Sequence, residues 1–287
     1  MLFMKKQTIY VIAGPTASGK SKLALNLAEK IGGEIINADA FQVYQGLSIL
    51  TARPTEAQMQ GIPHHLYGYM DNYSQENVHG WIKKVAETIP NVKNPIVVGG
   101  TGLYLSVLND GISPIPTISE EIRQKVRMMD PKEVLAKLTQ GVVPKDIQRQ
   151  KRALEVFLET GHPIDYFQSL PKQKIIHAEF KNILILPKRE ELYNRIEERL
   201  IQMLQGGIVQ EVQNLLNSTP TGGVLKAIGV KELTDFIEKK CDLPTALKNI
   251  LLATKHYAKR QKTWFRHQMP HNTQTIESAD MWNVITK

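Results

Sequence analysis

Residues 8–31 read TIYVIAGPTASGKSKLALNLAEKI, and this stretch decides the fold. Ile9–Ala13 is a continuous β-branched and aromatic run of the kind that is buried on both faces in a parallel sheet. Gly14–Ser21 matches the pattern G-x-x-x-x-G-K-[ST], and an apolar, helix-like segment follows it up to Gly32-Gly33. A strand, a glycine loop and a helix in this order predict a P-loop that binds an oligophosphate.

The physical chemistry of this loop gives each residue type a function. Glycines let backbone N–H groups surround an anion, and the helix N-terminus adds its positive dipole end. Lys20 is expected to reach the terminal phosphates, and Ser21 is the expected ligand of Mg²⁺. The pattern indicates a phosphate and does not by itself identify ATP. The residues predicted to bind diphosphate or nucleotide here are Gly14, Pro15, Thr16, Ala17, Ser18, Gly19, Lys20 and Ser21.

Three further apolar runs, at 34–38, 95–98 and 182–186, read as strands separated by helical segments. This alternation predicts a doubly wound α/β core with a P-loop NTPase-like parallel sheet and a ligand site at the carboxyl ends of its strands. From Leu192 onward the pattern is nearly all helical.

The chain changes character between Gly111 and Gln148, where prolines and charged amphipathic segments replace the strands. We expect a small helical insertion domain over 112–147. The P-loop core, with its helical C-terminal part, is then expected to comprise 1–111 and 148–287.

Composition limits the classes of protein that fit. The 287 residues are 42% hydrophobic, which excludes a disordered chain, and 36 Lys and Arg against 28 Asp and Glu give a net charge of +8. That excess favours an anionic partner such as nucleic acid or phosphate. The single cysteine, Cys241, cannot form an internal disulfide and favours a reducing compartment, the cytoplasm. No apolar run is long enough to cross a membrane.

Asp39 is the one carboxylate that closes a predicted core strand. P-loop kinases and hydrolases usually place an acid after a later strand, but the run 95–98 leads into Gly99-Gly100-Thr101. Asp39 is therefore a candidate general base or metal ligand, and a capping role is the structural alternative. Gln42 follows at a spacing that lets both side chains point into one site. His64-His65 lacks further ligand spacing and favours a structural role.

The segment 253–268 (ATKHYAKRQKTWFRHQ) contains no acid and repeats its cations with helical spacing. Lys255, Lys259, Lys262 and Arg266 would form a basic stripe on one helix face, where RNA backbone is a suitable partner. Its aromatic residues are expected to pack into the core more than to stack on bases.

Taken together, these pieces resemble the bacterial tRNA dimethylallyltransferases, also called tRNA isopentenyltransferases. The resemblance covers nearly the whole chain, in family order, and the GGTGLYL and AKRQKTWFR pieces carry its specificity. The matching pieces are GPTASGKS (14–21), NADAFQVYQG (37–46), TARPT (51–55), PHHL (63–66), VVGGTGLYL (97–105), QRQKRALEV (148–156), the expected helix 191–204, AIGVKEL (227–233) and YAKRQKTWFR (257–266).

The resemblance implies transfer of the dimethylallyl group from dimethylallyl diphosphate to the N6 amine of adenine 37, beside the anticodon, in tRNAs that read codons starting with U. It implies Mg²⁺ as cofactor, the tRNA anticodon arm as partner, and a cytoplasmic monomer without a membrane partner. Asp39, Thr101 and Lys20 would be catalytic, and Lys226 would join the diphosphate site. The residues implied to contact tRNA are Asp39, Ala40, Phe41, Gln42, Thr101, Arg123, Gln148, Arg149, Gln150, Lys151 and Arg152.

The sequence also departs from the family pattern. Gly68 stands where PHHL is usually followed by Asp, Val230 replaces a usual Tyr, and the insertion is shorter than usual. Two alternatives stay open from the residues alone: a P-loop kinase acting on a small molecule or nucleotide, and a non-catalytic RNA-binding module with a vestigial P-loop.

Overall fold

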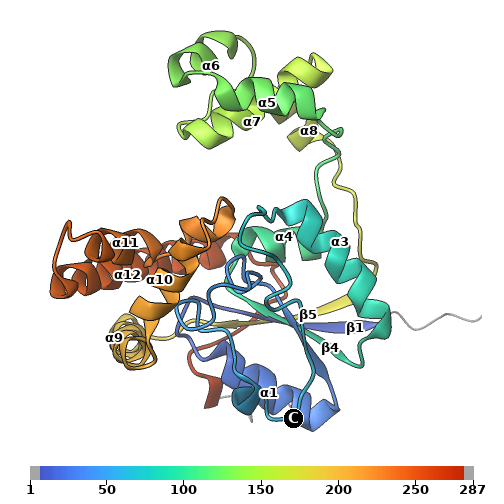
Figure 1. The fold of residues 1–287 in the computed structure, drawn as a ribbon. Coiled ribbons are helices and arrows are strands. Elements are labelled where there is room, and N and C mark those ends of the chain that lie inside the picture. Colours follow the sequence, from blue (N-terminus) through green and yellow to red (C-terminus); the bar gives the residue numbers. More distant parts are fainter. Residues whose placement is uncertain (1–6, 281–287) are drawn as a thin grey trace, which may run out of the picture. The chain divides into compact units, whose positions relative to one another are not determined.

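A computed structural model describes residues 7–280. Its centre is a six-stranded, all-parallel sheet with the strand order β3-β2-β4-β1-β5-β6 (Figure 1). The strands are β1 (Thr8–Ala13), β2 (Glu34–Asn37), β3 (His64–His65), β4 (Pro95–Gly99), β5 (Glu179–Ile185) and β6 (Gln274–Ile276). The sequence prediction of a doubly wound parallel sheet is confirmed.

Helices cover both faces of this sheet. Figure 1 shows α1 on one face and α3 and α4 on the other. On the first face α1 buries Leu23 and Leu27 against Ile12, Ile35 and Ile96 of the strands. These three helices are α1 (Lys20–Ile31), α3 (Val78–Thr88) and α4 (Gly102–Asp110); the short α2 (Glu56–Met59) and the 3₁₀ turn η1 (Ile89–Asn91) lie in the connections.

The C-terminal third is helical, as its pattern predicts. Gly206 and Gly207 separate the first two helices, and Gly207 has a φ of 92°, which glycine adopts at little cost. A second apolar cluster joins these helices to residues 43–50. The elements are α9 (Arg189–Gln205), α10 (Ile208–Asn217), η2 (Gly223–Lys226), α11 (Val230–Ile237) and α12 (Leu243–Gln268).

Residues 110–175 form a separate compact unit, so the expected insertion boundaries of 112–147 are too narrow. The reason is packing: α7 contacts α5 and α6, and Leu154 of α7 is buried with Val126 and Val134. The unit contains α5 (Glu120–Met128), α6 (Pro131–Lys137), α7 (Ile147–Thr160) and α8 (Ile164–Ser169). The core unit is accordingly 1–109 with 176–287.

Two short strands, β3 and β6, are absent from the sequence prediction because each has three residues or fewer. The histidines of β3 have local partners: His65 Nε2 lies 2.6 Å from Glu34 Oε2, and His64 Nδ1 lies 2.8 Å from the Ile62 carbonyl. Within 7–280 no group of three or more His, Cys, Asp or Glu is placed to hold a metal.

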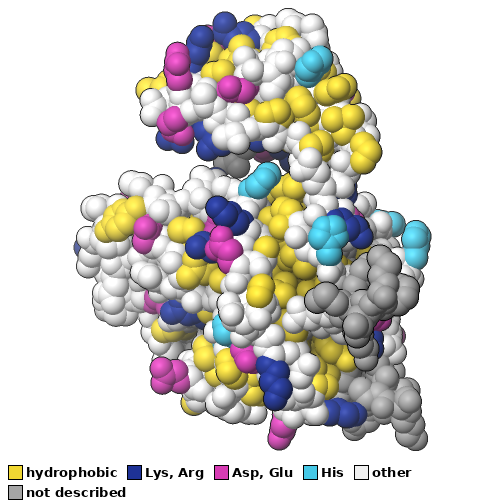
Figure 2. Space-filling model, turned by 90° about the vertical axis from the view of Figure 1, so that its right-hand side faces the viewer, with side chains coloured by type: hydrophobic (Ala, Val, Ile, Leu, Met, Phe, Trp, Pro, Cys, Tyr) yellow, Lys and Arg dark blue, Asp and Glu magenta, His cyan; other side chains and the backbone are white. Residues whose placement is uncertain are grey.

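The positive charge is dispersed on the face drawn in Figure 2. Lysine and arginine side chains there lie among acidic and histidine side chains instead of forming one basic patch. No helix in the described part of the chain is long and apolar enough to span a bilayer.

Candidate active site

The loop between β1 and α1 has P-loop geometry. Ala17 has a φ of 60° and Gly19 a φ of 95°, so the backbone curls back before α1 begins at Lys20. Ser18 N–H donates to the Pro15 carbonyl at 3.2 Å and closes the turn. The Ser18 hydroxyl is buried without a hydrogen-bond partner, as expected of a loop built to receive a polar ligand.

Lys20 lies across this loop and is partly buried. Its ammonium donates to the Pro15 carbonyl at 2.8 Å. Burial lowers the pKa of Lys20 to about 8; the nearby Asp39 carboxylate opposes that shift, and the Arg199 guanidinium adds to it. Lys20, Asp39 and Arg199 therefore share one electrostatic environment, as the sequence predicts for Lys20 and Asp39.

Thr16 is held from two helices of the C-terminal third. Arg199 of α9 donates from Nη1 to the Thr16 hydroxyl at 3.1 Å. Gln261 of α12 accepts the Thr16 backbone N–H at 2.9 Å. The phosphate loop is thus fixed by residues about 180 to 245 positions away in the sequence.

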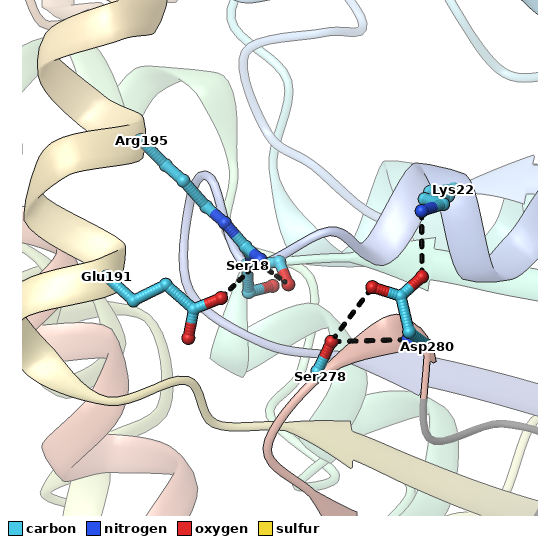
Figure 3. A network of polar contacts seen from close by, with 6 residues as sticks. All are labelled: Ser18, Lys22, Glu191, Arg195, Ser278 and Asp280. Atoms are coloured by element: carbon cyan, nitrogen blue, oxygen red, sulfur yellow. Dashed lines mark hydrogen bonds and ion pairs between the residues drawn. The ribbon is translucent and has the colours of Figure 1, made fainter.

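A second set of contacts holds the outer rim of the loop (Figure 3). Arg195 donates to the Ser18 carbonyl at 3.3 Å and pairs with Glu191 at 2.5 Å. Lys22 pairs with Asp280 at 2.8 Å, and Asp280 also contacts Ser278. These pairs are largely exposed, so they contribute little stability and chiefly orient side chains around the loop.

Asp39 is presented by a turn built around the buried Asn37. Asn37 Oδ1 accepts the Asp39 N–H at 2.9 Å, and Asn37 Nδ2 donates to the carbonyls of Asp39 and Leu66. Asp39 Oδ1 accepts the N–H groups of Phe41 and Gln42 at 2.9 and 3.4 Å. The carboxylate is thereby oriented by the backbone that follows it.

The turn between β4 and α4 brings Thr101 against the same segment. The Thr101 hydroxyl accepts the Ala40 N–H at 2.9 Å. A Cβ on Gly99 would lie 2.0 Å from the Ala38 carbonyl oxygen, so this close approach of the two strand ends requires glycine. Asp39, Ala40 and Thr101 therefore come together, as predicted.

A cavity with about 100 Å³ of free space adjoins Asp39, Thr16 and Arg199. Its other walls are mainly apolar, and Tyr257 of α12 contributes an aromatic ring. Burial raises the pKa of the Tyr257 hydroxyl, and the Asp39 carboxylate raises it further. The apolar lining residues are Phe41, Leu50, Ile196, Leu200, Met203, Ala227, Ile228, Ile250 and Leu251.

One side of this cavity depends on Glu211 of α10. Its carboxylate accepts the N–H groups of Ser48, Ile49 and Leu50 at 2.7 to 2.8 Å and the Ser48 hydroxyl at 2.9 Å. Leu50 lines the cavity, so Glu211 fixes the segment that supplies this part of the wall.

Glu211→Ala is expected to lower the free energy of unfolding by about 2–4 kcal/mol, because three partly buried N–H groups lose a charged acceptor. The melting temperature measures this loss. Glu198→Ala, the same change at an exposed position of α9, is the control and should leave the melting temperature unchanged within a degree. Equal melting temperatures for the two variants would contradict the assignment.

The remaining predicted site residues of the core unit differ in whether they line the cavity. Gln42 Nε2 donates to the carbonyls of Thr51 and Ala52 at 3.0 and 2.9 Å, so its amide nitrogen holds a loop instead of pointing into the cavity. Phe41 lines the cavity. Lys226 is exposed at the end of η2, directly before Ala227 of the cavity wall, and it makes no hydrogen bond or ion pair with the described residues.

In the unit 110–175, Gln148 and Arg149 are exposed at the start of α7. Three neighbours on α7 have partners within the unit: Gln150 binds the Pro144 carbonyl, Lys151 the Arg127 carbonyl, and Arg152 pairs with Glu155. Arg123 of α5 has a buried Nε without a hydrogen-bond partner.

In the expected basic stripe of α12, two of the four cations have partners within the protein and two are exposed. Lys255 pairs with Glu197 at 2.5 Å, and Lys262 donates to the Pro187 carbonyl at 2.6 Å. Lys259 and Arg266 are exposed. The prediction that the aromatic residues pack inward holds for Phe265, which is 1% exposed.

Arg199, Gln261 and Tyr257 are site residues that sequence reasoning missed. Arg199 lies in the segment that the sequence predicts to be helical from Leu192 onward, but nothing local separates it from a surface arginine. Gln261 stands inside the quoted YAKRQKTWFR piece, and a glutamine flanked by basic and aromatic residues was the available signal.

Fold and site together define a P-loop α/β enzyme of the group-transfer class, in which a phosphate loop and a carboxylate face an apolar cavity. The IPP transferase family model matches residues 42–268, and the chain belongs to this family.

Relatives and solved structures agree with this assignment. The tRNA dimethylallyltransferase of Zymomonas mobilis is 40% identical over 92% of this chain and 89% of its own. The tRNA isopentenylpyrophosphate transferase structure from Staphylococcus epidermidis has a TM-score of 0.71 at 30% identity, covering 98% of both chains. A eukaryotic dimethylallyltransferase acting on tRNA has a TM-score of 0.81 at 27% identity, covering 98% of this chain and 76% of its own.

Proposed function

We propose that this enzyme is a tRNA dimethylallyltransferase that transfers the dimethylallyl group from its diphosphate to the N6 amine of adenine 37. The observation that carries the proposal is the meeting of Asp39, Lys20, Arg199 and the apolar cavity at the carboxyl ends of β1 and β2. A diphosphate leaving group, an apolar five-carbon group and an amine acceptor together need such a site.

Each part of the site has a step in this mechanism. The P-loop N–H groups, Lys20 and Arg199 bind the diphosphate and stabilise the charge that grows on it as the carbon–oxygen bond breaks. The apolar cavity excludes water from the allylic carbon. Asp39 accepts a proton from N6 as the new carbon–nitrogen bond forms, and diphosphate leaves.

Mg²⁺ is the proposed cofactor. Ser21 is exposed at the first turn of α1, next to the loop, and its hydroxyl is a suitable hard oxygen donor. Magnesium usually takes only one or two protein ligands and keeps several waters, so diphosphate oxygens and water would complete its coordination beside Ser21. Bound there, the ion would neutralise charge on the leaving group.

The tRNA anticodon arm is the proposed acceptor, with Arg123, Gln148 and Arg149 as contacts from the unit 110–175. The adenine must leave its stack to reach Asp39, as in other enzymes that modify a base. The same proposal describes a cytoplasmic monomer.

One assay tests the proposal against the kinase alternative. The enzyme is incubated with tRNA, Mg²⁺ and either labelled dimethylallyl diphosphate or γ-labelled ATP. We expect label from the prenyl donor in tRNA. Phosphoryl transfer from ATP without prenyl transfer would establish the kinase instead, and RNA binding without either reaction would establish the non-catalytic module.

Lys20 makes diphosphate binding sensitive to pH. A lysine pKa near 8 means that the cation is present below pH 8 and is lost as pH rises through this value. Affinity for inorganic diphosphate, measured by calorimetry from pH 7 to 9.5, should fall above pH 8 by up to about tenfold per pH unit. Lys20→Arg retains its charge and should flatten the profile; equally steep profiles would contradict the role of Lys20.

A further inference from the structure

Gln261 is a buried polar residue that the proposed chemistry does not use. Its side chain lies within α12 and is 6% exposed. Oε1 accepts the Thr16 N–H of the P-loop at 2.9 Å, and Nε2 donates to the Gly100 carbonyl at 2.8 Å. One amide therefore joins the phosphate loop to the β4–α4 turn.

The side-chain amide of Gln261 is packed closely against the backbone of the β4–α4 turn. A Cβ on Gly100 would lie 2.5 Å from Gln261 Nε2, so the turn rests directly on the side chain. Tyr257, one helical turn earlier on α12, lines the apolar cavity, and Gln261 lies close enough to its hydroxyl to affect the pKa of that group. Gln261 thus contacts the phosphate loop and the turn that precedes Thr101, and it lies one helical turn from Tyr257 of the cavity wall.

We propose that Gln261 is a positioning residue that sets the P-loop and the Gly100–Thr101 turn in register for the transfer reaction. The inference rests on the proposed function. An amide suits this role because it offers a donor and an acceptor on one planar group, whereas a carboxylate has no donor and an apolar side chain has neither. Holding the Thr16 N–H also fixes the start of the loop, which leaves the later N–H groups free for phosphate.

Gln261→Met keeps the length of the side chain and removes both hydrogen bonds. Calorimetry with inorganic diphosphate and Mg²⁺ is expected to show affinity at least tenfold weaker than in the parent, with the KM for dimethylallyl diphosphate raised to match. Binding of tRNA should change less than twofold. Gln268→Met, the same substitution at an exposed position of α12, is the matched control and should behave as the parent.

Gln261→Glu separates the two bonds. It keeps an acceptor for Thr16 but faces the Gly100 carbonyl without a donor, so it should lower kcat at least tenfold with a smaller effect on diphosphate affinity. This split would not arise from a structural role, which lowers the fraction of active enzyme and leaves both KM values unchanged.

Two results would overturn the proposal. One is parental diphosphate affinity, within twofold, in folded Gln261→Met. The other, decisive if that variant does not fold, is parental kcat per active enzyme in Gln261→Glu. If the parent bound diphosphate but transferred no prenyl group to tRNA, the proposed function would fail, while the diphosphate comparison would still report on Gln261.

Discussion

Asp39→Asn is expected to lower kcat by about 10²–10⁴-fold while tRNA affinity stays within a few-fold of the parent. Asparagine retains an oxygen for the N–H groups of Phe41 and Gln42, so the turn is preserved. Its amide does not accept the N6 proton. Single-turnover transfer of the prenyl group, measured at saturating substrate, checks the effect on chemistry.

Asp71→Asn is the matched control for this substitution. Asp71 lies on an exposed loop and accepts the N–H groups of Tyr73 and Ser74 in a similar turn. Its variant should retain parental rates. A defect in Asp39→Asn that consisted of weaker diphosphate binding, relieved by additional Mg²⁺, would make Asp39 a metal ligand and refute the assignment as base.

Arg199→Met should reduce kcat/KM for dimethylallyl diphosphate by about 10²–10³-fold. The residue is a cation at a water-poor site, bound to Thr16 and next to Lys20, and such charges stabilise a leaving diphosphate far more than exposed ones do. Steady-state kinetics at saturating tRNA measures the loss, and calorimetry with inorganic diphosphate isolates the part due to binding.

Two other arginines of α9 calibrate that result. Arg189→Met changes an exposed residue at the start of the helix and should have no effect. Arg195→Met removes a contact with the Ser18 carbonyl at the rim and should have an intermediate effect. If Arg189 and Arg199 variants lost activity equally, the effect would reflect the general charge of α9 and not the geometry at Thr16.

Local sequence predicted the parts of the site that lie within one strand, loop and helix. The glycine loop, Lys20 and the Asp39 turn are set by residues adjacent in the chain, so their chemistry is visible in the pattern. Arg199 and Gln261 reach Thr16 only because α9 and α12 fold back on the loop. The approach of α9 and α12 to the loop results from tertiary packing, and the local spacing of residues does not predict it.

The same reasoning explains the insertion boundary. The pattern of residues 112–147 differs from that of the core, but α7 begins with a segment that resembles the rest of the helical C-terminal part. Its membership in the unit 110–175 depends on Leu154 and Val156 being buried there, which periodicity alone does not reveal.

The order of the strands has a consequence for synthesis of the chain on the ribosome. β1 pairs with β5, and 165 residues separate the end of one from the start of the other. At typical rates of translation, the edge of β1 that pairs with β5 therefore stays unpaired for on the order of 10 s. The Thr16 N–H lacks its acceptor for longer still, because Gln261 is synthesised near the end of the chain. The phosphate loop is thus completed late, and a nascent chain stalled before α12 would retain a sheet but should not retain diphosphate.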